Sequence, residues 1–202
     1  NKSGNGTNDR FYNRVMFPII DVRGNVIAFG GRIMTDQKPK YLNTSDTPVF
    51  SKSNNLFSLN NAKKNQDRTL ILCEGYMDVI AVNQAGFQNA VATLGTALTS
   101  QQASVMKRYA DDVIICYDAD EAGQKATQRA IGILRRSGLN IRVLTVPDGK
   151  DPDEFIRKHG DNGGAAFYNL VNGSFNDVEY QLSKVRKKYD LKLADQRVKY
   201  VN

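Results

Sequence analysis

The stretch Val113–Gly123, with the sequence VIICYDADEAG, determines the expected fold of this chain. Its first half is an apolar run of the length of a buried strand, and its second half places Asp118 and Asp120 directly after that strand. The residues that follow have helical spacing up to Gly138, a residue type that commonly ends helices. A buried strand that continues into a helix is the repeating unit of a parallel sheet covered by helices.

Similar strand-and-helix units are predicted on both sides of this stretch. Thr99 is followed three positions later by Gln102, which is the spacing of a helix capping box, and Pro152 after Asp151 is typical of a first helical turn. The expected strands are residues 70–73, 90–92, 113–117 and 141–146, and the expected helices begin near residues 76, 99, 120 and 151. In the third helix, the small and apolar residues expected to face the sheet are Ala122, Ala126, Ala130 and Ile133. The fold class is therefore α/β, with a parallel sheet covered on both faces.

Two flanking segments differ from this pattern. Residues 15–32 predict a β-hairpin with its turn at residues 21–25, and residues 38–48 predict a loop. Beyond Gly160 the sequence favours helices with a basic polar face. We expect three parts, namely a small β-rich basic subdomain (1–68), the α/β domain (69–160) and the start of a helical segment (161–202). The polar beginning without Met and the abrupt end suggest a piece of a longer protein.

The charge is distributed unevenly along the chain. The net charge is +7, and it divides into +6 for residues 1–68, −2 for residues 69–153 and +3 for residues 154–202. Basic flanks attract polyanions, whereas carboxylates gathered in a basic protein attract divalent cations. No apolar run approaches the roughly 20 residues that span a bilayer. Cys73 and Cys116 fit neither a zinc module nor a disulfide framework, so we expect the reducing cytoplasm.

Acidic residues follow three of the predicted strands. Glu74 comes directly after the first strand, Asp118 and Asp120 after the third, and Asp148, Asp151 and Asp153 after the fourth. Ligands of open α/β sheets bind beyond the carboxyl ends of the strands, so these acids are expected at one edge. Because clustered carboxylates repel one another, a shared Mg²⁺ or Mn²⁺ is the expected occupant.

Structural roles compete with this interpretation. Asp120 is placed to cap the helix that begins at Glu121, and Asp151 is placed to cap the next one, with Glu154 completing a capping box. Asp78, about one turn beyond Glu74, either supports the metal ligands from behind or faces solvent. His159 is expected to be a helix-end residue.

Several motifs together resemble the toprim domain of bacterial DnaG-type primases. They are Glu74-Gly75-Tyr76-Met77-Asp78, Tyr117-Asp118-Ala119-Asp120 and Asp151-Pro152-Asp153. The resemblance extends to Arg14–Ile19, Phe29–Arg32, Pro39–Asn43 and Pro147–Lys150, and it covers about residues 10–160. It implies a core that polymerises ribonucleoside triphosphates into short RNA primers on single-stranded DNA for replication.

The resemblance also implies residue roles. Glu74, Asp118 and Asp120 would hold the catalytic metal, with Asp151 and Asp153 at a neighbouring metal site. The positions associated with nucleotide binding are Arg32, Lys40, Tyr41 and Asn43, and those linked to the template groove are Arg10 and Arg14. The family's zinc-binding module and its helicase-binding domain are expected to be absent from this chain, so contact with the replicative helicase would require a domain that is not present.

The implied chemistry is nucleotidyl transfer, in which positioning and charge neutralisation matter most. Two other functions remain open. A toprim nuclease or topoisomerase would use similar metal chemistry to cleave DNA, and a toprim-like module without catalysis would only bind nucleic acid or a nucleotide. The presence of Glu74 together with both Asp118 and Asp120 argues against the last of these.

Overall fold

A small antiparallel sheet forms the N-terminal part of the molecule. The computed structural model describes residues 9–186. β1 (Arg14–Ile20), β2 (Val26–Ile33) and β3 (Tyr41–Asn43) pair antiparallel in that order. The predicted hairpin is confirmed, and its turn is fixed by Asp21, whose Oδ1 accepts the amides of Arg23 (2.8 Å) and Asn25 (2.9 Å). The predicted loop at residues 38–48 is wrong in part, because β3 pairs there with Gly30–Arg32 of β2.

The larger sheet has five strands in the order β5-β4-β6-β7-β8. β5 (Ala90–Ala92), β4 (Thr69–Cys73), β6 (Asp112–Cys116) and β7 (Asn140–Val143) are parallel, as the sequence predicts. β7 ends at Val143, three residues before the predicted end. The sheet is mixed rather than purely parallel, because the two-residue β8 (Phe175–Asn176) adds an antiparallel edge strand that the sequence did not suggest.

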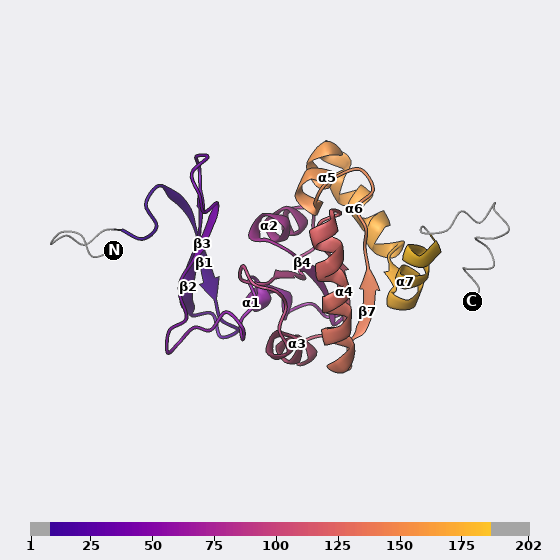
Figure 1. Cartoon of the computed structure of the whole chain (residues 1–202), viewed down its shortest axis with the longest axis horizontal. Coiled ribbons are helices and arrows are strands. Elements are labelled where there is room, and N and C mark those ends of the chain that lie inside the picture. The colour runs from indigo at the N-terminus through magenta and orange to yellow at the C-terminus, as the bar shows by residue number, and fades with distance from the viewer. Residues whose placement is uncertain (1–8, 187–202) are drawn as a thin grey trace.

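Helices cover both faces of this sheet, as Figure 1 shows. Their bounds are α1 (Leu59–Ala62), α2 (Tyr76–Gln84), α3 (Ser100–Lys107), α4 (Glu121–Arg136), α5 (Pro152–Lys158), the 3₁₀ helix η1 (Gly160–Asn162), α6 (Gly163–Asn172) and α7 (Asp177–Arg186). Alternation along β4 explains the two layers: Leu70 and Leu72 pack with α1, α3, α4 and α7, whereas Ile71 and Cys73 pack with α2, α5 and α6. None of the described helices is long and apolar enough to cross a membrane.

The buried face of α4 differs from the predicted one. Gly123, Thr127, Ala130, Ile131 and Leu134 are buried, whereas Ala122 is exposed. Ala126 and Ile133 are half-buried at the margin of the face. The prediction followed the alanines and missed Gly123 and Thr127, which are buried because the helix begins directly against the loop after β6. The helix ends as predicted, since Gly138 has a φ of +72°.

The two flanking segments pack onto the larger sheet. Leu56, Leu59 and Ala62 belong to the core beneath α3 and α4, and Tyr180 of α7 joins the same core. Ile19, Ala28 and Phe50 form a smaller core with Tyr76 and Leu94, so the antiparallel sheet rests on the edge that carries the acids. We keep the division at residue 68 as a proposal. The predicted helical segment is described as far as Arg186, and the rest of it lies outside the described residues.

Candidate active site

Glu74 and Asp118 meet at the carboxyl edge of the sheet. They follow β4 and β6, which lie side by side with Cys73 opposite Cys116. The amide of Asp118 donates a 3.3 Å hydrogen bond to Oε2 of Glu74, across 44 positions of sequence. The expected convergence of acids from separate strands therefore occurs for this pair, and the parallel pairing of β4 and β6 is its cause.

Asp120 holds the start of α4. Its Oδ1 accepts a 2.8 Å hydrogen bond from the amide of Gly123, so its capping role is confirmed. Gly123 in turn lies against the backbone of Asp118, because a Cβ atom at this glycine would stand 2.2 Å from the Asp118 carbonyl oxygen. The absence of a side chain at position 123 is what allows the acidic loop and the helix to pack this closely.

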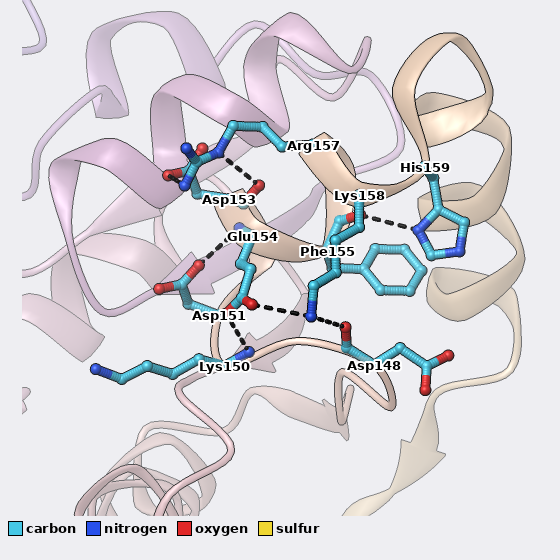
Figure 2. A network of polar contacts seen from close by, with 9 residues as sticks. All are labelled: Asp148, Lys150, Asp151, Asp153, Glu154, Phe155, Arg157, Lys158 and His159. Carbon is cyan, nitrogen blue, oxygen red and sulfur yellow. Dashed lines mark hydrogen bonds and ion pairs between the residues drawn. The ribbon is translucent and has the colours of Figure 1, made fainter.

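Asp151 and Asp153 have local partners in α5, shown in Figure 2. Oδ1 of Asp151 accepts the amide of Glu154 at 2.8 Å, and Asp153 forms an ion pair with Arg157 at 2.8 Å. The expected capping box is wrong in one half, because Glu154 accepts the amide of Lys150 (2.9 Å) rather than that of Asp151. His159 is the C-cap of α5, as predicted, and its ring lies 4.2 Å from that of Phe155.

Asp78 is buried, which excludes the solvent-facing interpretation. The residue is only 7% exposed. Its Oδ2 accepts a 3.0 Å hydrogen bond from the amide of Gly75, at the start of α2. Burial raises the pKa of Asp78 to about 7, and the charges of Asp151, Asp118 and Asp153 act in the same direction. Asp78 therefore lies within electrostatic range of acids from both later motifs.

Asp118 is a second acid whose pKa is raised by neighbouring carboxylates. Burial, followed by the charges of Glu74, Asp151 and Asp120, raises its pKa to about 6, against the opposing charge of Lys150. Beneath it lie the fully buried thiols of Cys73 and Cys116, whose pKa values are raised by burial, so both stay neutral. The edge consequently concentrates negative charge above an apolar layer.

This donor set fits a hard divalent cation. Carboxylate oxygens are the ligands that Mg²⁺ and Mn²⁺ prefer, and mutual repulsion among Glu74, Asp118 and Asp151 is what such a cation relieves. Asp120 and Asp151 each use only Oδ1 in capping and keep Oδ2 without a hydrogen-bond partner within residues 9–186. No three His, Cys, Asp or Glu side chains of that range already stand in a metal-binding arrangement. The structure thus gathers the acids without closing a ligand shell.

The residues expected to bind nucleotide lie in β2, directly before β3 and in β3, and they differ in how many hydrogen bonds they make within the protein. Arg32 and Tyr41 are register partners, and Nε of Arg32 is buried with no hydrogen-bond partner among the described residues. Burial raises the pKa of Tyr41, Arg32 lowers it and Asp78 raises it, so this pair lies within range of the acids. The ammonium of Lys40 is exposed and 6.0 Å from the centre of the Tyr41 ring.

Asn43 and Arg14 are engaged in holding the fold together. Oδ1 of Asn43 accepts the hydroxyl of Tyr76 at 2.7 Å, and its Nδ2 donates to Leu94 at 2.9 Å. Arg14 donates to the carbonyls of Gly31 (3.2 Å), Pro39 (2.8 Å) and Lys40 (3.2 Å). Arg10 reaches the carbonyl of Asn43 at 3.5 Å and is exposed. Among the six residues expected to contact nucleotide or template, Arg10 and Lys40 are the exposed cations with the fewest side-chain partners in the described part of the chain.

Sequence reasoning missed Lys150. Its carbonyl accepts the amide of Ala119 at 3.0 Å, which joins the loop before α5 to the acidic loop after β6. Its ammonium lowers the pKa of Asp118. The position of Lys150 next to Asp151 was visible in the sequence, but the docking of the two loops was not.

Two family models match the chain. One, described as Toprim-like, matches residues 71–156, and the other, described as the N-terminal domain of the DNA primase catalytic core, matches residues 1–63. A DNA primase of Clostridium acetobutylicum is 50% identical over 96% of this chain, and the chain spans about a third (32%) of the length of that relative.

Solved structures agree with the family models. The Aquifex aeolicus primase, comprising its zinc-binding and RNA polymerase domains, matches with a TM-score of 0.84 and 39% identity, covering 93% of this chain and 46% of that one. A DnaG primase catalytic domain bound to single-stranded DNA matches with a TM-score of 0.79 and 38% identity, covering 95% of this chain and 61% of that one. With the toprim edge and its acids in place, these matches establish that the chain belongs to the DnaG-type DNA primases and represents part of their catalytic core.

Proposed function

We propose that this chain carries the centre at which short RNA primers are made on single-stranded DNA from ribonucleoside triphosphates. The contact between Glu74 and the amide of Asp118 is the observation that supports this most strongly. It brings acids from two strands to one edge, where phosphoryl transfer needs positioned charge. Glu74, Asp118 and Asp120 are the proposed catalytic and metal-holding residues, and Asp151 and Asp153 are proposed for a neighbouring metal position.

The proposed reaction is nucleotidyl transfer. The 3′-hydroxyl of the primer gives up its proton to solvent water, its oxygen forms a bond to the α-phosphorus of the incoming nucleotide, and the bond from that phosphorus to pyrophosphate breaks. When bound at these carboxylates, Mg²⁺ or Mn²⁺ supplies the positive charge that the reacting oxygens require. Asp120 is oriented by capping α4, and Asp118 by the packing of Gly123 against its backbone.

Cations of the small sheet are proposed to bind the triphosphate. Lys40 projects from the loop before β3 as a free point charge, while Arg32 offers a guanidinium whose Nε has no protein partner within residues 9–186. Tyr41 lies beside both and provides a ring face for the nucleotide. Asn43 is proposed to act by orienting β3 against Tyr76, since both ends of its amide are already bonded.

The proposed partners follow from the chemistry and the relatives. The DnaG catalytic domain described above binds single-stranded DNA, and the excess of positive charge in residues 1–68 suits the same polyanion here. Arg10, Arg14 and their segment are proposed to face the template. The replicative helicase is proposed to be reached through a domain outside this chain, and the bacterial cytoplasm is the proposed place of action.

Template-directed ribonucleotide incorporation tests the proposal. The chain is incubated with single-stranded DNA, ribonucleoside triphosphates and either Mg²⁺ or Mn²⁺, and labelled RNA products are measured. Asp118→Asn is expected to lower incorporation by roughly 100-fold or more, because it removes charge from the centre of the site with little change in volume. Asp67→Asn, an exposed aspartate near the opposite end of β4, is the matched control.

Two outcomes would contradict the proposal. Full incorporation by Asp118→Asn would mean that this carboxylate is not required for the reaction. Metal-dependent cleavage of the DNA strand, with no RNA made, would replace primer synthesis by nuclease activity.

A further inference from the structure

A cavity of about 400 Å³ opens beside Glu74, on the face of the sheet that α3 and α4 cover. Its inner walls are apolar and include Leu98, Tyr117 and Ala130, which are all buried. Its volume lies near the lower end of the roughly 300–1,000 Å³ that small-molecule sites occupy. The cavity is therefore of a size for one compact group next to a proposed catalytic carboxylate.

The rim of this cavity is polar and carries a cation. Thr96 and Arg129 line it and are exposed, and Arg129 forms no ion pair with another described residue. The amides of Gly95, Thr96 and Ala97 donate no hydrogen bond to any of residues 9–186. A ligand that enters the apolar interior would thus meet several hydrogen-bond donors at the opening.

The loop that carries these donors is held at both ends. Nδ2 of Asn43 donates to the carbonyl of Leu94 at the start of the loop. Thr99 stands at the end of the loop and caps the start of α3, where its hydroxyl oxygen accepts a 3.0 Å hydrogen bond from the amide of Gln102. The same hydroxyl donates a 2.7 Å hydrogen bond to the carbonyl of Ser53. Hydrogen bonds at Leu94 and Thr99 thus tie both ends of this loop to neighbouring segments.

We propose that this cavity receives the base of a nucleotide whose sugar and phosphate lie toward Glu74 and Asp118. A base has flat apolar faces that suit the walls of Leu98, Tyr117 and Ala130, and acceptor atoms on its edge that suit Arg129 and the free amides. The inference rests on the proposed function, because it assumes that Glu74 faces the reacting end of a nucleic acid. The base belongs either to a strand nucleotide or to the incoming triphosphate.

Filling the cavity tests the inference. Ala126 is half-buried and lines the cavity, so Ala126→Phe places a ring inside it. Gln128→Phe adds the same ring at an exposed position of the same helix that does not line the cavity, and it is the matched control. Arg129→Gln removes the cation at the rim, with the exposed Arg136→Gln as its control.

Two probes distinguish the sources of the base. One is a single-stranded oligodeoxynucleotide that carries 2-aminopurine, and the other is 2-aminopurine ribonucleoside triphosphate. Fluorescence titration measures the affinity of each. Ala126→Phe is expected to weaken binding of at least one probe about tenfold, the size of one stacked base, while Gln128→Phe leaves both unchanged. Weakening with the oligonucleotide alone assigns a strand nucleotide, and weakening with the triphosphate alone assigns the incoming one.

The inference is overturned if neither Ala126→Phe nor Arg129→Gln changes the affinity for either probe. Circular dichroism checks the fold of each variant, and if Ala126→Phe does not fold, Arg129→Gln against Arg136→Gln decides. Failure of this inference can be distinguished from failure of the proposed function. If the variants bind both probes as well as the unaltered chain does, and the unaltered chain makes RNA, only the base site is wrong. If the variants bind a probe more weakly but the unaltered chain makes no RNA, the base site stands and the proposed reaction is wrong.

Discussion

The hydroxyl of Tyr76 donates a 2.7 Å hydrogen bond to Oδ1 of Asn43. This contact joins the first turn of α2, next to Glu74, to β3 of the small sheet. Tyr76 also packs against Phe57 with ring centres 4.6 Å apart, and Gly30 of β2 is so close that a Cβ there would stand 2.6 Å from the Tyr76 ring. The cations of the small sheet and the acids of the large one are therefore positioned relative to each other through Tyr76.

Tyr76→Phe tests this connection. The change leaves Oδ1 of Asn43 without its donor, so we expect the free energy of unfolding to fall by about 1 kcal/mol. Urea denaturation measures the loss, and Tyr12→Phe, at a tyrosine that is 78% exposed, is the control. Equal stability of the two variants would mean that the hydrogen bond contributes nothing.

Lys40→Ala tests the triphosphate site. Lys40 is exposed and has no ion-pair partner among the described residues, so its loss should not affect folding. We expect affinity for ATP to fall about tenfold, because a charge-assisted contact is removed. Calorimetric titration compares this variant with Lys64→Ala, at an exposed lysine that has no proposed role in nucleotide binding. An unchanged affinity would count against the role of Lys40.

Asp78→Asn tests the buried carboxyl. Burial raises the folded-state pKa of Asp78 from 3.8 to about 7. The unfolded chain therefore loses this proton at lower pH than the folded chain, and the ionised carboxylate destabilises the fold progressively as pH rises from about 4 to 7. Asparagine keeps the acceptor for the Gly75 amide and carries no charge.

We expect Asp78→Asn to be more stable than the unaltered chain above pH 7, by about 1–3 kcal/mol, and the difference to vanish near pH 4. Urea denaturation at several pH values, in a chelator, measures it. A difference that stays constant with pH would exclude titration of Asp78 as its source.

Addition of Mg²⁺ tests the proposed metal centre without catalysis. A cation that binds the folded acids and not the unfolded chain raises the melting temperature with concentration. At pH 8 we expect such a rise for the unaltered chain and a smaller one for Asp118→Asn. Differential scanning calorimetry records both, and identical responses would place the bound cation elsewhere.

Salt dependence tests the basic flank. Each phosphate that a protein cation neutralises on a single strand contributes about −0.7 to the slope of log affinity against log salt concentration. Arg10→Gln is expected to reduce the magnitude of that slope by about this amount, whereas Arg108→Gln, an exposed arginine at the end of α3, leaves it unchanged. Fluorescence anisotropy with a labelled oligodeoxynucleotide provides the measurement.

The local signals of the sequence predicted the α/β domain well. The limits of β5 agree with the predicted strand, and the capping residues Thr99 and Asp151 are where the spacing placed them. β3 was missed because three residues between a proline and a polar turn carry no alternation, and only the backbone of β2 makes them a strand. β8 was missed for the same reason, since its two residues depend on β7.

The acids were predictable as a group, but their individual environments were not. Strand ends place Glu74 and Asp118 together, whereas the burial of Asp78 depends on the packing of α2 against α5. The bonding of Asn43 to Tyr76 and Leu94 joins residues 33 and 51 positions apart, and no local pattern encodes it. The resemblance to the primases named these positions without distinguishing ligand contacts from those that hold the fold together.

The neutral, fully buried thiols of Cys73 and Cys116 lie directly beneath the acids. Because both side chains are fully buried, the solvent side of Asp118 is where opposite charge approaches it, and Lys150 is the described cation that lowers its pKa. In the proposed function, metal ion, triphosphate and template all approach these acids from that solvent side. Whichever component of the proposed reaction binds first would then change the electric field that the next one meets.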